Sequence, residues 1–139
     1  MYFIHTNVFL RYFVSDDHQE VEDCTRLLQS IDDGQVDGCI SSLVLSEIVW
    51  TMTSFYKVPR AKIVDSIQFI TSLGGIRMIE GYQYDLALML FSTFNIKFID
   101  CMIASIPQIQ KGEMTIISYD KDFDKLGVKR IEPGDLHFE

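Results

Sequence analysis

Cysteine, proline and long apolar runs are all scarce in this chain of 139 residues. The three cysteines, Cys24, Cys39 and Cys101, are an odd number, lie far apart and include no Cys-x-x-Cys pair. A disulfide framework and a zinc knuckle are therefore both disfavoured, and a reducing cytoplasm is the expected location. No apolar stretch approaches the roughly 20 residues that a membrane-spanning helix needs. The residues after Met1 also lack the pattern of a secretory signal, so we expect no membrane association.

Basic residues are few as well, since 12 Lys and Arg stand against 20 Asp and Glu, for a formal net charge of −8. This balance argues against a protein that holds nucleic acid by a broad basic face, because counterion release needs clustered Lys and Arg. It does not exclude a nuclease whose acids hold metal ions, since bound cations invert the local charge.

Length and patterning predict one domain over residues 1–139, without internal repeats. Short β-type runs alternate with amphipathic helical runs. Strands are expected at 2–5, 36–40, 76–79, 114–118 and 128–131. Helices are expected at 7–14, 17–31, 42–56, 59–73, 82–94 and 98–110, with a loop rich in Asp after residue 118. This alternation predicts a three-layer α/β/α sandwich around a mostly parallel sheet, with ligands bound beyond the carboxyl ends of the strands.

Two isolated acids lie among apolar residues in the expected helices. Glu47 stands in the middle of an apolar helix, where a carboxylate is costly to desolvate without a partner. It is either a site residue or an acid at the helix rim paired with Lys or Arg. Asp100 opens a later helix, where an acid ordinarily favours the helix dipole, but its neighbours Ile96, Ile103 and Ala104 are of core type.

A cluster of aspartates follows the expected strand 114–118. Aspartates in loops commonly form turns and helix caps. Asp120 and Asp122, however, are two residues apart at the carboxyl end of a strand, where both could contact one cation. Asp124 is expected to be solvated. Converging carboxylates repel one another unless hard cations lie between them, and oxygen-only ligation suits Mg²⁺ or Mn²⁺. Two such cations about 4 Å apart can activate water for phosphodiester cleavage.

Four segments in this order and spacing resemble the PIN-domain family, and within it the VapC-like toxins of prokaryotic toxin–antitoxin pairs. They are Tyr2–Arg11 (YFIHTNVFLR), Ser41–Glu47 (SSLVLSE), Phe98–Ala104 (FIDCMIA) and Ile117–Phe123 (ISYDKDF). The resemblance spans the whole chain. It implies a metal-dependent endoribonuclease on a parallel sheet flanked by helices, a homodimer, and an antitoxin that occupies the substrate groove.

The resemblance also implies roles for individual residues. Glu47, Asp100 and Asp120 match metal ligands, and Asp122 matches an auxiliary ligand or an acid that orients water. Two further groups match supporting or substrate-facing positions: Thr6 and Asn7 support the first acid and line the site, and Arg11 lies near the substrate groove.

His5 departs from the family pattern, which has Asp at this position as a metal ligand. A lone His beside an apolar strand is ordinarily a core or hydrogen-bonded residue. Three explanations stay open: a natural degenerate PIN domain, a changed metal preference, or an inactivating change introduced into this chain. From this mismatch we favour inactivation, natural or acquired, over a new chemistry. A neutral imidazole can bind a divalent ion but supplies no negative charge and prefers softer metals than Mg²⁺. A site poorly loaded with Mg²⁺ is therefore expected.

Two principal functions follow: a toxin endoribonuclease acting on RNA with Mg²⁺ or Mn²⁺, or a PIN-fold binding module that has lost catalysis and acts through a dimer or antitoxin. The retained acids favour the first and His5 favours the second. A metal-dependent phosphatase is a weaker third, since no Asp nucleophile follows the first strand. No Ser-His-Asp arrangement with supporting motifs is expected. Apolar residues of one helix form either core or a partner surface: Trp50, Met52, Phe55 and Tyr56.

Overall fold

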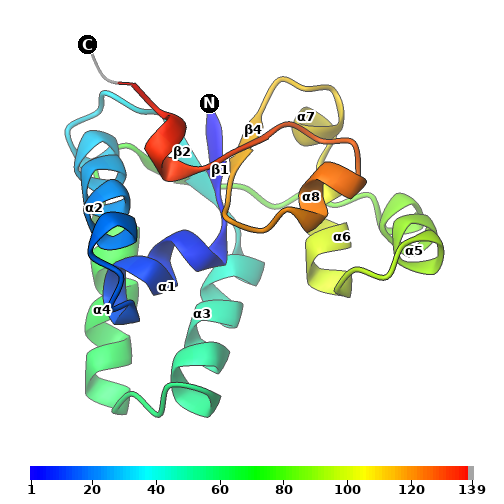
Figure 1. Ribbon diagram of the computed structural model, residues 1–139. Helices are drawn as coiled ribbons and strands as arrows, with labels where there is room; N and C mark the ends of the chain where they lie inside the picture. The colour runs from blue at the N-terminus through cyan, green and yellow to red at the C-terminus, as the bar shows by residue number, and fades with distance from the viewer. Residues whose placement is uncertain (138–139) are drawn as a thin grey trace.

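Five short strands form one parallel sheet at the centre of the computed structural model, which describes residues 1–137 (Figure 1). The last two residues of the expected domain, 138–139, lie outside the described part. The strands are β1 (Tyr2–Ile4), β2 (Gly38–Ile40), β3 (Ile76–Met78), β4 (Thr115–Ile117) and β5 (Arg130–Ile131). Their order is β3-β2-β1-β4-β5, and each pair of neighbours is parallel.

Helices cover both faces of this sheet, which confirms the expected sandwich (Figure 1). The chain moves from β1 to β3 toward one edge and then returns through β4 to β5. Because parallel crossovers are right-handed, the connections of the two halves lie on opposite faces. The first half contains α1 (Thr6–Val14), α2 (His18–Asp32), α3 (Ser42–Ser54) and α4 (Arg60–Ser72). The second contains α5 (Tyr84–Thr93), α6 (Phe98–Ala104), α7 (Pro107–Gln110) and α8 (Asp122–Lys125), followed by the 3-10 helix Pro133–Asp135.

The three central strands, β1, β2 and β4, are continuous apolar runs because both faces of the sheet are buried there, whereas the edge strands β3 and β5 are only partly buried. Phe3 and Ile4 of β1 and Ile116 and Ile117 of β4 are fully inaccessible to solvent. The chain reverses direction between β1 and β4, so the carboxyl ends of these two strands form the switch point at which parallel sheets bind ligands. No helix within residues 1–137 has the length and apolarity to cross a membrane.

The expected helix over 98–110 is wrong as one element. The structure has two helices, α6 and α7, separated by Ser105 and Ile106. Pro107 causes the break, because its ring would clash with the carbonyl four residues earlier and it has no N–H to donate. It instead occupies the first turn of α7, a position that suits proline. The Asp-rich loop also contains a one-turn helix, α8, that the sequence did not predict.

Two hydrogen bonds to Glu80 connect the segment after β3 with the start of α3. The backbone N–H of Ser42, at the start of α3, donates to Glu80 Oε1 at 2.6 Å, and the Tyr82 hydroxyl donates to Glu80 Oε2 at 2.8 Å. Burial raises the pKa of the Glu80 carboxyl, but these hydrogen bonds outweigh it and leave the pKa below its usual value.

Before β3, Gly75 approaches the carbonyl oxygen of Ile31 so closely that a Cβ would collide with it.

Candidate functional site

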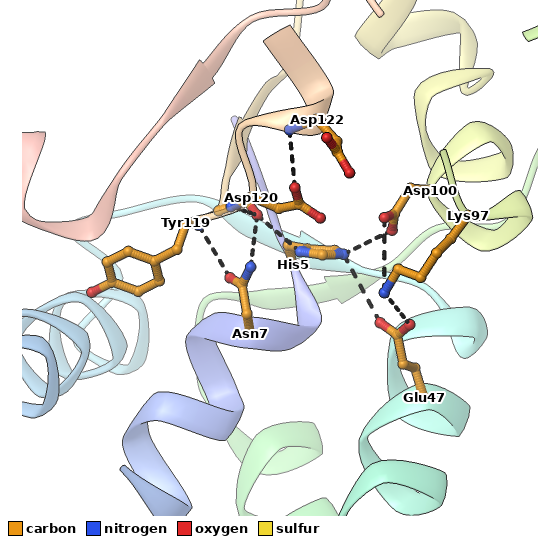
Figure 2. A network of polar contacts seen from close by, with 9 residues as sticks. His5, Asn7, Glu47, Lys97, Asp100, Tyr119, Asp120 and Asp122 are labelled. Carbon is orange, nitrogen blue, oxygen red and sulfur yellow. Dashed lines mark hydrogen bonds and ion pairs between the residues drawn. The ribbon is translucent and has the colours of Figure 1, made fainter. Parts of the chain in front are cut away.

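His5 lies at the centre of the site, directly after β1 and before the first turn of α1. Its residue exposure is only 2%, and its ring packs edge-on against Phe123 with centroids 5.0 Å apart. Polar side chains from four other segments point toward it in Figure 2. The ordinary expectation for such a residue, a buried and hydrogen-bonded histidine, is therefore confirmed.

A chain of hydrogen bonds fixes the ring and its proton. Ser118 Oγ accepts from Asn7 Nδ2 at 3.0 Å and from the Asp120 backbone N–H at 2.9 Å. Because a hydroxyl has two lone pairs and one proton, its O–H is left to donate to His5 Nδ1, 2.9 Å away. His5 Nε2 then carries the ring proton and donates to Asp100 Oδ1 at 3.1 Å.

Ser118, His5 and Asp100 thus form a Ser-His-Asp chain that the sequence did not predict. It does not form a hydrolase triad, since Ser118 is fully buried and both lone pairs of its Oγ accept hydrogen bonds. Its role is to orient the imidazole. The signal available in the sequence was the position of Ser118 at the carboxyl end of β4, beside the carboxyl end of β1.

Glu47 and Asp100 come together on the other side of the ring, where they meet a lysine (Figure 2). The Lys97 ammonium is 3.3 Å from Glu47 Oε2 and 3.9 Å from Asp100 Oδ2. Glu47 Oε1 lies 3.9 Å from His5 Nε2. Burial lowers the pKa of Lys97, but the attraction of Asp100 and Glu47 outweighs it and raises the pKa above its usual value. Glu47 therefore has the paired environment that was one of its two expected explanations.

Asp120 and Asp122 form a second acidic group, beyond the ring from Glu47 (Figure 2). The backbone N–H of Asp122 donates to Asp120 Oδ1 at 2.9 Å, and the Asp122 carboxylate forms an ion pair with Lys125 at 3.1 Å. The charge of Asp120 also contributes, after those of Asp100 and Glu47, to raising the pKa of Lys97. Asp124 lies apart, exposed and paired with Arg130 at 3.0 Å.

The three supporting positions occupy different surroundings. Asn7 lines the site, since its Oδ1 accepts from the Tyr119 backbone N–H at 3.2 Å while its Nδ2 donates to Ser118. Thr6 is buried beside His5. Arg11 lies over the Tyr119 ring, 4.8 Å from its centroid, and its Nε is 2.9 Å from Glu20 Oε2. Arg11 is therefore held at the side of the site, and within residues 1–137 its only ion pair is with Glu20, not with Glu47, Asp100, Asp120 or Asp122.

The arrangement does not fit a resident Mg²⁺ ion. Two buried carboxylate oxygens, Glu47 Oε1 and Asp100 Oδ2, have no hydrogen-bond partner among the described residues, and such oxygens are natural cation ligands. However, Mg²⁺ requires near-octahedral oxygen ligation at about 2.0–2.1 Å. Here His5 and Lys97 occupy the contacts of these carboxylates, and within residues 1–137 no three His, Cys, Asp or Glu side chains converge to hold a metal.

Sequence reasoning overlooked Lys97, although it lies three residues before Asp100 at the position that caps α6. That spacing places the two side chains on neighbouring positions of one helix turn. Its second partner, Glu47, is 50 residues away and comes from α3, so only the tertiary structure brings the three charges together.

Comparison with known proteins supports the family suggested by the four segments. A model of the PIN domain matches residues 2–129. The fold also resembles two solved structures at a TM-score of 0.66 and 17% sequence identity. VapBC2 from Rickettsia felis, bound to a DNA fragment from its promoter, is matched over 94% of this chain and 97% of that chain. FitAcB from Neisseria gonorrhoeae is matched over 98% of this chain and 100% of that chain. No curated protein sequence matches significantly.

Proposed function

The chain belongs to the PIN domain family, and from this premise we propose that it is a metal-dependent endoribonuclease of the toxin–antitoxin type, impaired by His5. One observation carries the proposal: Glu47 and Asp100 lie 3.9 Å and 3.1 Å from His5 Nε2 at the switch point of a parallel sheet, and Asp120 and Asp122 follow Ser118, which contacts the other side of the same ring. Glu47, Asp100, Asp120 and Asp122 come from α3, α6, the loop after β4 and α8. Loss of a site by drift would be expected to remove several of these acids, whereas only the position after β1 has changed.

The proposed roles follow the family pattern residue by residue. Glu47, Asp100 and Asp120 are the ligands for Mg²⁺ or Mn²⁺, with Asp122 as an auxiliary acid, once residue 5 is again a carboxylate. Thr6 and Asn7 support that residue. Arg11 contacts RNA only after its pair with Glu20 opens, because Arg11 Nε now lies 2.9 Å from Glu20 Oε2.

The alternative is a catalytically inactive binding module. The hydrogen-bond chain from Ser118 through His5 to Asp100 favours it, because every polar atom of the imidazole already has a partner. Such a ring stabilises the protein without a cation. The alternative keeps the same partners, an antitoxin and a second copy of the chain, and omits only the cleavage.

A protein partner is supported by apolar side chains that the fold leaves exposed. Trp50 on α3 is 67% exposed, and Leu88 and Met89 on α5 are each 55% exposed. Met52, which the sequence grouped with Trp50, is instead buried in the core at 2%. We propose that these exposed surfaces serve a homodimer and an antitoxin, the two protein partners that the resemblance to VapC-like toxins implies. Three free, buried thiols agree with a cytoplasmic location.

RNA cleavage by three proteins tests the proposal: the chain with His5, His5→Asp and His5→Asn. Asn matches the shape of Asp without its charge, so it separates charge from the mere removal of imidazole. A panel of structured RNAs is incubated with Mg²⁺, with Mn²⁺ and with EDTA. Cleavage by His5→Asp alone, abolished by EDTA and by adding Asp100→Asn, supports a nuclease impaired at one ligand.

If His5→Asp cleaves none of these RNAs, the binding module becomes the better account. Light scattering coupled to size exclusion tests the dimer separately. A monomer at high protein concentration would count against the homodimer without affecting the proposed cleavage.

A further inference from the structure

Lys97 occupies the position between the two buried acids that a cation would otherwise neutralise (Figure 2). Its ammonium reaches carboxylates from two separate helices, Glu47 on α3 and Asp100 on α6. Among the described residues, no other Lys or Arg forms an ion pair with either acid. Because the side chain of Asp100 is only 1% exposed, its negative charge needs a neighbouring positive charge or proton donor.

The two groups that serve Asp100 differ in strength and in mobility. His5 donates one well-formed hydrogen bond to Oδ1, whereas Lys97 remains 3.9 Å from Oδ2, which has no hydrogen-bond partner. The Lys97 side chain is 61% exposed, while those of Glu47 and Asp100 are 14% and 1% exposed. A long exposed side chain can withdraw into solvent, whereas the two carboxylates are held by their helices.

We propose that Lys97 is the internal counter-cation of this acidic centre and competes with divalent cations for Glu47 and Asp100. The inference rests on the proposed function only in treating these acids as the cation site. Lys97 stabilises the cation-free protein by neutralising the two acids. A divalent ion can bind Glu47 and Asp100 fully only when the ammonium has moved away. Restoring the carboxylate at position 5 is therefore insufficient for the tightest binding.

Titration calorimetry with Mn²⁺ tests the competition without RNA. The proteins are His5→Asp and His5→Asp/Lys97→Met, where Met keeps much of the side-chain length and removes the charge. We expect the double variant to bind Mn²⁺ more tightly by about tenfold or more, because a like charge has been removed a few ångströms from the ion. The control is His5→Asp/Lys111→Met. Lys111 is exposed and precedes β4, at the opposite edge of the sheet from the acids.

Equal Mn²⁺ affinity in all three proteins, including no detectable binding in any, would overturn the proposal. A gain of the same size in the Lys111 control would do so as well, because it would be a general charge effect. Thermal unfolding in EDTA provides a second test: Lys97→Met alone should lower the melting temperature by about 1–4 °C, and Lys111→Met should not. An unchanged melting temperature contradicts the stabilising role.

These outcomes separate the two proposals. Tighter Mn²⁺ binding by the double variant without RNA cleavage supports the role of Lys97 and contradicts the proposed nuclease. Cleavage by His5→Asp, with Mn²⁺ affinity unaffected by Lys97→Met, supports the proposed nuclease and contradicts the role of Lys97.

Discussion

Ser118→Ala tests whether the hydrogen-bond chain through His5 stabilises the fold. The Ser118 hydroxyl is fully buried and forms three hydrogen bonds of 2.9–3.0 Å, with His5, Asn7 and the Asp120 backbone. Its removal leaves His5 Nδ1 as a buried acceptor without a partner, at a cost of about 1–3 kcal/mol. The other two partners are only partly buried and regain water, so each adds about 0.5 kcal/mol. We expect a total loss of about 2–4 kcal/mol.

Urea unfolding followed by circular dichroism measures this loss. With a slope of about 2 kcal/mol per molar urea, the midpoint should fall by about 1–2 M with the slope unchanged. Ser30→Ala is the matched control. Ser30 is also buried, at 6%, but its hydroxyl donates only to the Arg26 carbonyl within α2, and its loss leaves no isolated buried polar group. Alanine also favours a helix, so the control should change stability by no more than about 0.5 kcal/mol.

The reasoning is refuted if Ser118→Ala and Ser30→Ala unfold at the same urea concentration. That result would mean that water or a rotated imidazole replaces the hydroxyl at no cost. A large loss with a changed slope would point to a different effect, namely an altered native or denatured state.

Three further predictions concern regions away from the site. The lowered pKa of Glu80 adds stability that is complete above its ordinary pKa of 4.5 and is lost as the pH falls through the pKa of the folded state. Glu80→Gln should therefore be less stable than the unsubstituted chain at pH 7 and equally stable in acid. Urea unfolding at each pH measures this difference. Burial raises the thiol pKa of Cys24 to about 11 and of Cys39 to about 12, so a disulfide reagent at pH 8 should label them only after unfolding, measured by absorbance. Gly75→Ala should cost about 2–4 kcal/mol because its Cβ meets a backbone carbonyl, whereas Gly127→Ala, with open space but φ of +72°, should cost about 1–2 kcal/mol in the same urea assay.

The sheet could be predicted from the sequence because parallel strands buried on both faces are continuous apolar runs. Every expected strand has its counterpart, although β2 and β5 each begin two residues later than expected, at Gly38 and Arg130. The helical break before Pro107 was missed because the apolar residues on either side, Ile103 and Ile109, both continue into the core. Hydrophobic periodicity records which side chains are buried, and it does not record whether the backbone between them remains helical.

The candidate site was predictable to the extent that topology places it. Acids that follow β4, or that lie in the first half of α3 and α6, are expected near the carboxyl ends of the parallel strands, so their general neighbourhood follows from the order of elements. The ion pairs and hydrogen bonds that these acids form do not follow from the order of elements. The contact of Lys97 with Glu47 depends on how two helices from opposite halves of the chain meet, and the proton on His5 Nε2 depends on three bonds to one serine hydroxyl.

One side chain decides whether this acidic centre needs a cation. With Asp at position 5, the short approach to Asp100 would bring two carboxylates together, and their repulsion would favour any divalent ion that could lie between them. With His5, the same approach becomes a hydrogen bond of 3.1 Å to Asp100 Oδ1, and Lys97 compensates the acid beside it. The protein therefore gains stability from the residue that removes the demand for metal. Stability and cation binding are opposed at this position, as they commonly are where a functional site holds like charges together.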